Sequence, residues 1–556
     1  MASKISRRLF LGTAAWGAAG VGMTRAPSAY ATSPRSLPAP GDITETDPGL
    51  LSAVEAASLL QARALHPREL LDACLRRSAD SDGDVNAWAR IYPETAYHAA
   101  EQAAQRLSRA AARETGETVP LVCGLPLALK DLYAVAGLPL TASSKVLEGN
   151  IAAGDSGVWR RLRDAGMVLM GHTHTHEFAI GVSTPRVGNP WNPAYSAGGS
   201  SGGSAAALAA GFVPLATGTD TGGSLRFPAS MCGVSSIKPT FGRCSMAGVI
   251  PLTWTRDHAG PMGRSLADAS LLLTYMAGYD VDDPSTGAGP EAPRGGYPLS
   301  AQRGSNPLGG RRFGIPMREA GKLTGSQARL FQEFVNVVRQ LGGVTVDVTM
   351  PSTPSGLLVG DMAEAGAYHQ QFSDRLGLYD TDNAMLVAAF IAALAGPVAD
   401  FLVLERDRMR FRGDYNRMFD EHRLDAIVLP GTTVDGAKRT QFMDVSVFSA
   451  GMGDVRWANY VGAPVVQTPV GRSSETGIPF GVQLGGRPWG EAELIALGLE
   501  VQEALPAWRE RPTLPVRRRE ITEVAMVAPS AGPDATNTRG AAAPFHSLPT
   551  NSVAGE

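Results

Sequence analysis

The stretches GGSSGGS (residues 198–204) and GTDTGGSLRFP (residues 218–228) decide how this chain is interpreted. The segment between them has the pattern of a small-residue helix, a stop at Gly211 and a buried strand. A glycine-rich turn directly after a strand allows several backbone N–H groups to converge around one hydroxyl without obstruction by side chains. The pattern therefore predicts that Ser224 lies at the carboxyl end of a strand, which is where α/β sheets usually bind ligands.

Strand and helix patterns alternate along most of the chain. Apolar runs predict buried strands, as in VPLVCGLPLAL (119–129) before Lys130, and three- to four-residue apolar spacing predicts helices. Residues 204–220 predict a small-residue helix, a stop at Gly211 and then a strand. Further strands are expected from residue 167 and over 311–316, 344–350, 424–433, 463–471 and 479–488, and helices over about 51–78 (a second one could begin at Pro67), 326–341 and 490–504. This alternation predicts a large α/β sheet covered on both faces.

Composition limits the class of protein. The 556 residues are 44% apolar and 19% charged, which is an ordinary globular balance. The formal net charge is −3 and no long basic run occurs, so we expect no nucleic-acid partner. No segment predicts a stable membrane span. The four cysteines form no C-x-x-C pair, which argues against structural zinc; Cys232 and Cys244 could pair in an exported protein, but isolated buried thiols are favoured.

The two ends of the chain differ from its centre. Residues 1–31 contain an arginine pair, a short apolar segment and a small-residue cleavage pattern near Ala31, and resemble a twin-arginine export signal. We therefore expect an exported protein, periplasmic or extracellular. Residues 32–48 have the composition of a linker, 49–520 that of one large globular domain, and 521–556 that of a disordered tail with too few apolar residues to fold.

Serine needs a base within hydrogen-bond reach to act as a nucleophile at neutral pH. The two glycine-serine stretches, GLPLALKDLYAV (124–135), DHAGPMGRSLADAS and GIPFGVQLGGRPWGEAELIALGLEVQEA occur in the order found in the amidase signature family, which this chain strongly resembles over residues 48–510. The resemblance implies a large mixed, twisted β-sheet covered by helices on both faces. It also implies hydrolysis of carbon–nitrogen amide bonds through an acyl-enzyme, with no cofactor.

The family's site residues are carried over by position. Ser224 matches the nucleophile, Lys130 the base, and Ser200 the serine that bridges them and follows a cis peptide bond in this family. Ser200 and Ser224 are separated by the 24 residues that the family pattern requires. The oxyanion-hole positions are Thr221, Gly222, Gly223 and Ser224, and the supporting polar positions are Ser201, Asp220 and Arg226. Asp131, beside the lysine, is expected to be a structural acceptor rather than a catalytic acid.

Other interpretations compete with this one. His172, His174 and His176 alternate after a predicted strand, so they could share one face and bind the metal of a metal-dependent hydrolase. A Ser-His-Asp hydrolase would need a nucleophile elbow between strand and helix, and none is recognised. A non-catalytic binding protein with an amidase fold is the third alternative. The first is tested by chelation and the last by covalent labelling of Ser224.

The substrate is less constrained than the reaction. Some members of the family are amidotransferase subunits that supply ammonia for transfer-RNA charging, but the export signal favours a stand-alone amidase, monomeric or homodimeric. Residues 351–460, where specificity varies in the family, are apolar or aromatic with few charges. We therefore expect a moderately apolar pocket for a small-molecule substrate: an aliphatic or aryl amide, an anilide, a peptide C-terminal amide or a cyclic amide oligomer. Ester hydrolysis is expected as a side activity.

Overall fold

The computed structural model describes residues 36–112, 118–302, 304–354, 356–439 and 455–516. The predicted signal (1–31), the start of the predicted linker and the predicted tail (521–556) lie outside these residues. Leu37 and Ile43, from the rest of the predicted linker, pack against the hydrophobic core, and Pro38 O accepts a hydrogen bond from Ser58 Oγ at 2.6 Å.

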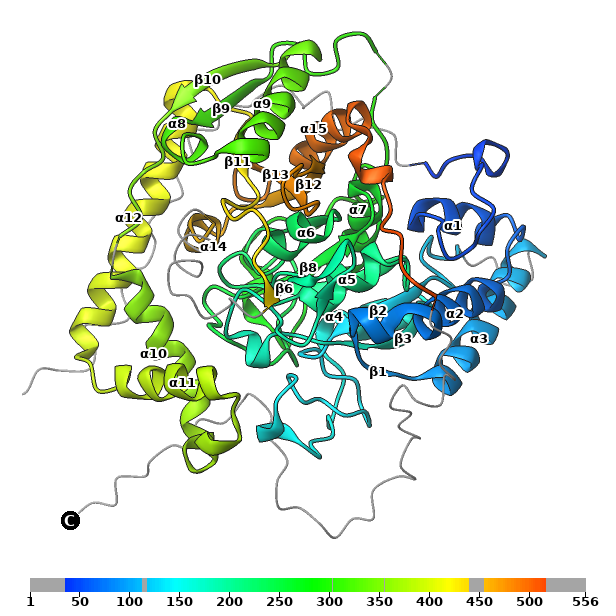
Figure 1. Ribbon diagram of the computed structural model, residues 1–556, viewed down its shortest axis with the longest axis horizontal. Coiled ribbons are helices and arrows are strands. Elements are labelled where there is room, and N and C mark those ends of the chain that lie inside the picture. Colours follow the sequence, from blue (N-terminus) through cyan, green and yellow to red (C-terminus); the bar gives the residue numbers. More distant parts are fainter. Residues whose placement is uncertain (1–35, 113–117, 303, 355, 440–454, 517–556) are drawn as a thin grey trace, which may run out of the picture.

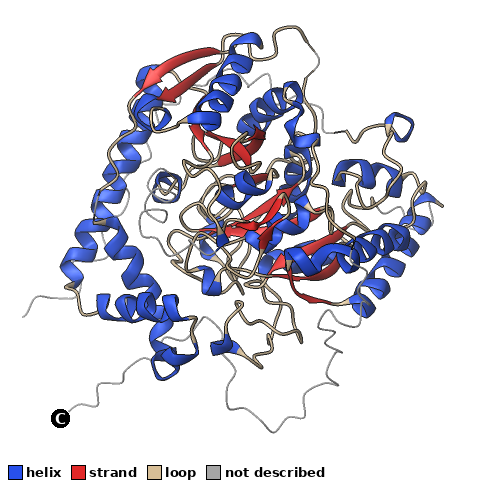
Figure 2. Cartoon of the chain, viewed as in Figure 1, coloured by secondary structure: helices blue, strands red, loops and turns tan. Residues whose placement is uncertain are grey.

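One mixed sheet of eleven strands runs through the described molecule, in the order β1-β3-β2-β6-β8-β7-β12-β13-β11-β9-β10. Figure 2 shows the strands in red among the helices. The fold class predicted from the sequence is confirmed. Strand β2 pairs parallel with β3 and β6, and β9 pairs parallel with β10 and β11, whereas the strands between these two groups pair antiparallel. The bounds are β1 Trp88–Ile91, β2 Pro126–Lys130, β3 Val168–Thr173, β6 Leu215–Asp220, β7 Ser235–Lys238, β8 His258–Gly263, β9 Arg312–Pro316, β10 Val344–Val348, β11 Ala426–Pro430, β12 Val465–Arg472 and β13 Pro479–Gly485, with a separate hairpin of β4 Gly188–Asn189 and β5 Asn192–Ser196.

Helices cover both faces of the sheet. They are α1 Ala53–Gln61, α2 Pro67–Val85, α3 Pro93–Ala111, α4 Gly157–Asp164, α5 Gly202–Ala209, α6 Arg226–Cys232, α7 Leu266–Met276, α8 Met317–Ala320, α9 Gly325–Gln340, α10 Leu357–His369, α11 Thr381–Ala393, α12 Val398–His422, α14 Trp457–Val461 and α15 Glu491–Ala504 (Figure 1). Two glycines of β8 mark the two faces. A side chain at Gly260 would meet Leu225, next to α6, and one at Gly263 would meet Asp268 in α7; an odd spacing in a strand puts these on opposite sides.

Most predicted elements are present with shifted ends. The helix expected over 51–78 is two helices, and the second does begin at Pro67, where His66 and Glu69 form a capping box. The strand expected from residue 119 starts only at Pro126, because residues 121–124 turn and Gly124 has φ +86°. The sequence patterns did not predict β1, β7 and β8; β8, with the sequence HAGPMG, has few of the residue types enriched in strands.

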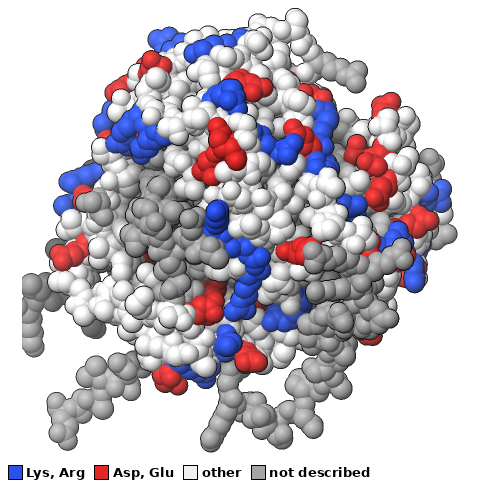
Figure 3. Space-filling model, in the orientation of Figure 1, with Lys and Arg blue, Asp and Glu red and all other residues white. Residues whose placement is uncertain are grey.

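Helices α10, α11 and α12 form an excursion from the sheet along one edge of the molecule (Figure 1). They come from the stretch 351–460 that was expected to vary with substrate. No single helix in the described residues is long and apolar enough to cross a membrane; one sharply bent pair, Asn383–Ala393 with Val398–His422, meets the criterion only jointly. On the face shown in Figure 3, acidic and basic side chains are interspersed.

Candidate active site

Lys130 ends strand β2 in the interior of the protein. Its side chain is fully buried, and its Nζ lies 2.8 Å from Ser200 Oγ, 2.9 Å from Ser201 Oγ and 2.8 Å from Thr219 Oγ1. The sheet explains this meeting, because β2 and β6 are parallel neighbours and therefore bring their carboxyl ends to one edge. Lys130 and the turn after Asp220 consequently lie at the same end of the sheet.

Burial sets the protonation of this lysine. It lowers the pKa of Lys130 from its usual value of 10.5 to about 7, against the opposing influence of the carboxylates of Asp220 and Asp257. Among the residues that the structure describes, the groups that contact Nζ are hydroxyls and none is a carboxylate. A substantial fraction of Lys130 is therefore neutral near pH 7, as a proton acceptor requires.

Ser200 and Ser201 lie in the bend before helix α5. The peptide bond between Gly199 and Ser200 is cis. Ser201 Oγ lies 3.3 Å from both the backbone N–H and the carbonyl oxygen of Thr219, so it links the bend to β6. The backbone N–H of Ser201 also donates to the carbonyl oxygen of Ser224 at 3.3 Å, which places the two glycine-serine stretches next to each other.

Ser224 lies in the turn between β6 and α6 and is 6% exposed. Within the described residues, its hydroxyl makes no hydrogen bond. The backbone N–H of Gly223 donates to Asp220 Oδ1 at 2.8 Å and is therefore engaged. The N–H groups of Thr221, Gly222 and Ser224 donate to no acceptor in the described part of the chain, so these three are the available donors among the four predicted positions.

A buried ion pair holds this turn. Arg226 Nε donates to Asp220 Oδ2 at 2.9 Å and Arg226 Nη2 to Asp220 Oδ1 at 3.1 Å, and both side chains are fully buried. Burial alone would raise the pKa of Asp220, but the charge and hydrogen bonds of Arg226 hold it well below its usual value. The guanidinium also donates to Val455 O at 2.8 Å, to Gln483 Oε1 at 2.9 Å and to Asn459 Oδ1 at 2.9 Å. Every polar atom of the pair is thereby satisfied, which a buried ion pair needs.

Several residues of the site were not predicted. Asp257 Oδ1 accepts from Thr221 Oγ1 at 2.5 Å, and its carboxylate also accepts the N–H groups of Leu252 and Thr253. Asn459 Nδ2 donates to the backbone oxygen of Asp220 at 2.7 Å. Asp257 opens the block DHAGPMG, which carried part of the family resemblance, so a signal existed for it; Asn459 had none.

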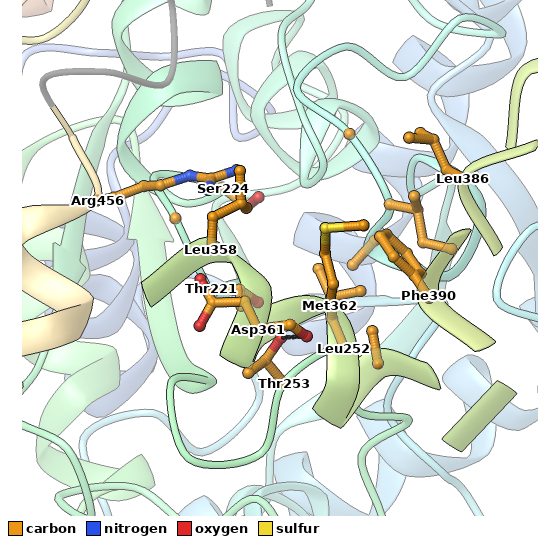
Figure 4. Close-up of a pocket in the computed structure, with 15 residues that line it drawn as sticks. Thr221, Ser224, Leu252, Thr253, Leu358, Asp361, Met362, Leu386, Phe390 and Arg456 are labelled. Atoms are coloured by element: carbon orange, nitrogen blue, oxygen red, sulfur yellow. Dashed lines mark hydrogen bonds between the residues drawn. The ribbon is translucent and has the colours of Figure 1, made fainter. Parts of the chain in front are cut away.

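Ser224 opens into a pocket of about 170 Å³ (Figure 4). Thr221, Gly222 and Ser224 form its reactive end. The opposite walls are mostly apolar, and their side chains come from α10 (Leu358, Met362, Ala365), from α11 (Leu386, Phe390) and from Leu252 and Ile180. Parts of the stretch 351–460 therefore line the pocket next to Ser224.

The three histidines do not form one cluster. Strand β3 ends at Thr173, so the strand alternation that would align His174 and His176 with His172 is absent. The ring of His172 contacts the Tyr92 hydroxyl at 2.7 Å and the Tyr133 carbonyl at 3.0 Å, whereas His174 contacts Ser143 Oγ at 3.1 Å. Within the described residues no group of three or more histidine, cysteine, aspartate or glutamate side chains is placed to hold a metal ion.

Two further expectations concern Asp131 and the cysteines. Asp131 accepts hydrogen bonds from Thr141 Oγ1 at 2.7 Å and from the Ser143 N–H at 2.9 Å, and it pairs with Arg90 at 3.2 Å, which are the contacts of a structural acceptor. All four cysteines are buried free thiols, so Cys232 and Cys244 do not pair.

Comparison with known proteins places this geometry in a family. The amidase family matches residues 69–495. A Pseudomonas putida protein named amidase is 34% identical over 480 residues, covering 83% of this chain and 97% of its own length. A glutamyl-tRNA(Gln) amidotransferase subunit from Chloroflexus aurantiacus is 31% identical over 507 residues, covering 84% of this chain and 99% of its own. The crystal structure of the native peptide amidase from Stenotrophomonas maltophilia has a TM-score of 0.71 at 27% identity, over 83% of this chain and 98% of that one.

The chain therefore belongs to the amidase (amidase signature) family. The family and the relatives named amidase identify it as an enzyme that hydrolyses carbon–nitrogen amide bonds.

Proposed function

We propose that this chain is a stand-alone serine amidase in which Lys130, Ser200 and Ser224 form a catalytic triad. The observation that carries the proposal is the 2.8 Å contact between Ser200 Oγ and a fully buried Lys130 whose pKa is lowered to about 7. A neutral amine beside a hydroxyl is a general base, and an unengaged serine in the adjacent turn is its target.

The proposed reaction uses these three residues in turn. Neutral Lys130 accepts the proton of Ser200, which in turn accepts the proton of Ser224 as that oxygen attacks the amide carbonyl. The developing oxyanion is stabilised by the unengaged N–H groups of Thr221, Gly222 and Ser224. Ser200 then donates its proton to the leaving nitrogen as the carbon–nitrogen bond breaks, and protonated Lys130 returns a proton to Ser200 and becomes neutral again. Water, deprotonated by the same route, cleaves the acyl ester and regenerates Ser224.

The apolar walls of the pocket favour a small amide substrate with an apolar group, such as an aliphatic amide, an anilide or a peptide C-terminal amide. Esters are additional substrates because they have the better leaving group.

We further propose export through the signal at residues 1–31 and function apart from an amidotransferase complex. N-terminal sequencing of the protein recovered from the periplasm and medium tests export; a protein that keeps residues 1–31 and stays with the cytosol would contradict it.

Single alanine substitutions test the triad. Ser224→Ala, Ser200→Ala and Lys130→Ala should each lower kcat for a 4-nitroanilide by at least about 10³-fold. Ser204→Ala is the matched control, because Ser204 Oγ is equally buried but bonds to Thr173 and Thr217 O instead of Lys130. Circular dichroism checks the fold of each variant.

Covalent labelling separates an enzyme from a binding protein with the same fold. A fluorophosphonate should modify the wild-type protein at Ser224, and mass spectrometry of the labelled peptide identifies the site. An intact, folded Ser224→Ala protein that hydrolyses amides at the wild-type rate would refute the proposed triad. Activity lost on exhaustive chelation and restored by metal would instead favour a metal-dependent hydrolase.

A further inference from the structure

Two charged residues are found among the described residues that line the pocket, Asp361 from α10 and Arg456 from the segment before α14. The remaining lining residues are apolar or small and polar. A charge in such a pocket is not screened as it would be in bulk water, so each one affects which substrates bind. The two residues differ in whether a group of opposite charge in the protein already pairs with them.

The carboxylate of Asp361 is already compensated. Its Oδ1 lies 3.2 Å from Nε of the fully buried Arg256, and its Oδ2 accepts the hydroxyl of Tyr460 at 2.8 Å. Arg256 thus balances the charge of Asp361, and Tyr460 hydrogen-bonds to its Oδ2. A cationic substrate group would have to compete with Arg256 for this carboxylate.

The guanidinium of Arg456 is not compensated in this way. In the described part of the chain it forms no ion pair, although it lies close enough to Asp361 to act on its pKa: burial raises that pKa, and the charges of Arg256 and Arg456 oppose the rise. The hydroxyl of the neighbouring Tyr460 stays neutral, since burial raises its pKa well above the usual value. Arg456 is partly exposed, so its positive charge remains available to a ligand.

The backbone around Arg456 is fixed relative to Ser224. Val455 O accepts Arg226 Nη1 at 2.8 Å, and Asn459 Nδ2 donates to the carbonyl oxygen of Asp220 at 2.7 Å. The buried pair that holds the turn of Ser224 therefore also holds the segment that carries Arg456. Figure 4 shows the Arg456 side chain extending toward Ser224.

We propose that Arg456 is a specificity-determining residue, which selects amides that carry a carboxylate a short apolar distance from the scissile bond. The inference rests on the proposed reaction at Ser224. Guanidinium groups bind carboxylates through charge-assisted, often bidentate hydrogen bonds, and the apolar walls formed by Leu358, Met362 and Phe390 would accommodate the intervening carbon chain. The substrate class is accordingly the monoamides and monoanilides of short dicarboxylic acids.

Three 4-nitroanilides of similar length test the charge preference: glutaryl (anionic), hexanoyl (neutral) and 5-aminopentanoyl (cationic). In the wild type, kcat/KM should be highest for the glutaryl compound. Arg456→Gln should lower the glutaryl-to-hexanoyl ratio by about 10- to 100-fold, the range expected for one hydrogen-bonded charge, while hexanoyl hydrolysis changes by less than about threefold. Arg294→Gln removes the same charge from a side chain that is 95% exposed and outside the pocket, and should leave the ratio unchanged.

A second measurement does not depend on turnover of any anilide. Glutarate should slow fluorophosphonate labelling of wild-type Ser224 at concentrations where neutral glutaramide does not, and this protection should be lost in Arg456→Gln. The same comparison of glutarate with glutaramide on the wild type alone remains decisive if the variant fails to fold.

The outcomes separate this inference from the proposed function. Equal loss on all three anilides, an unchanged ratio, or a preference for the cationic anilide that Asp361→Asn removes would each overturn the role of Arg456. In all of these cases the reaction at Ser224 still holds if Ser224→Ala is inactive. An active Ser224→Ala protein would reject the triad itself, whatever the charge preference.

Discussion

Protonation of Lys130 at low pH should abolish the reactivity of Ser224 without unfolding the protein. The base in the proposed reaction must be neutral, and lowering the pH protonates it. For kcat/KM, which reports on the free enzyme, activity should therefore decline on the acidic side of the Lys130 pKa with a slope of one. Activity should therefore increase as the pH rises through the Lys130 pKa, because the neutral amine that acts as the base prevails above that pKa.

The size of the effect follows from the pKa of about 7. About 90% of Lys130 is neutral at pH 8 and about 1% at pH 5, so kcat/KM should fall by about 100-fold between these two values. A lysine with the usual value of 10.5 would instead keep activity rising up to about pH 10. The two cases differ by more than three units of pH, well beyond the uncertainty of a kinetic titration.

Replacing one of the hydroxyls around Lys130 should shift the decline of kcat/KM at low pH to a lower pH. Thr219 Oγ1 is one of three hydroxyls around Lys130 Nζ, and an ammonium group can donate to all three of them. Thr219→Val removes one acceptor, destabilises the ammonium form and should lower the apparent pKa by about one unit. Thr217→Val is the matched control, since Thr217 Oγ1 accepts the backbone N–H of Lys130 and does not contact Nζ.

The assay is kcat/KM for a 4-nitroanilide from pH 4.5 to 10, together with the rate of fluorophosphonate labelling of Ser224 over the same range. Circular dichroism at each pH verifies that the chain stays folded. Activity that is constant down to pH 5, or a limb that Thr219→Val and Thr217→Val move equally, would show that Lys130 is not the base.

Three further predictions concern the support of the site. Gly223 has φ +115° and an added Cβ would lie 2.8 Å from Val455 Cγ2, so Gly223→Ala should lose about 1–3 kcal/mol of unfolding free energy in urea together with most activity; a fully stable, active variant would contradict this. Arg226→Gln should cost about 3–5 kcal/mol, since Asp220 is left buried without its partner, and adding Asp220→Asn should restore part of the loss; no recovery would argue against charge as the cause. The four buried thiols should react with Ellman's reagent only after unfolding, and rapid reaction of the native protein would show local opening.

Structural elements that depend on a single segment could be predicted from the sequence of that segment alone. A single apolar run predicts each of three elements: the strand before Lys130, the short helix after Ser201 and the strand before Asp220. The order of these elements defines the edge of the sheet where the side chains meet. The contact of Lys130 with Ser200 could be expected because the resemblance concerned both segments at once. Strand β8 (258–263) was missed because its glycines permit close packing against both faces, which no strand propensity records.

Features that depend on distant segments could not be predicted in the same way. Asn459 contacts Asp220, and Gln483 contacts Arg226, across more than 200 residues, and neither belongs to a short motif. The engagement of the Gly223 N–H by the Asp220 carboxylate is likewise a matter of turn geometry. The position of Arg456 in the pocket follows from the same long-range network, so its charge could not be assigned to the site from sequence alone.

The arrangement separates the chemistry from the choice of substrate. The proposed triad comes from residues 130–224, within segments packed on the central strands, whereas much of the pocket wall comes from α10, α11 and the segment that carries Arg456. The buried Asp220–Arg226 pair joins the two parts, because it holds the turn of Ser224 and the backbone at Val455 together. Substitutions in α10 or α11 should therefore alter KM and the preference among amides, whereas loss of the pair should disturb catalysis and selectivity at the same time.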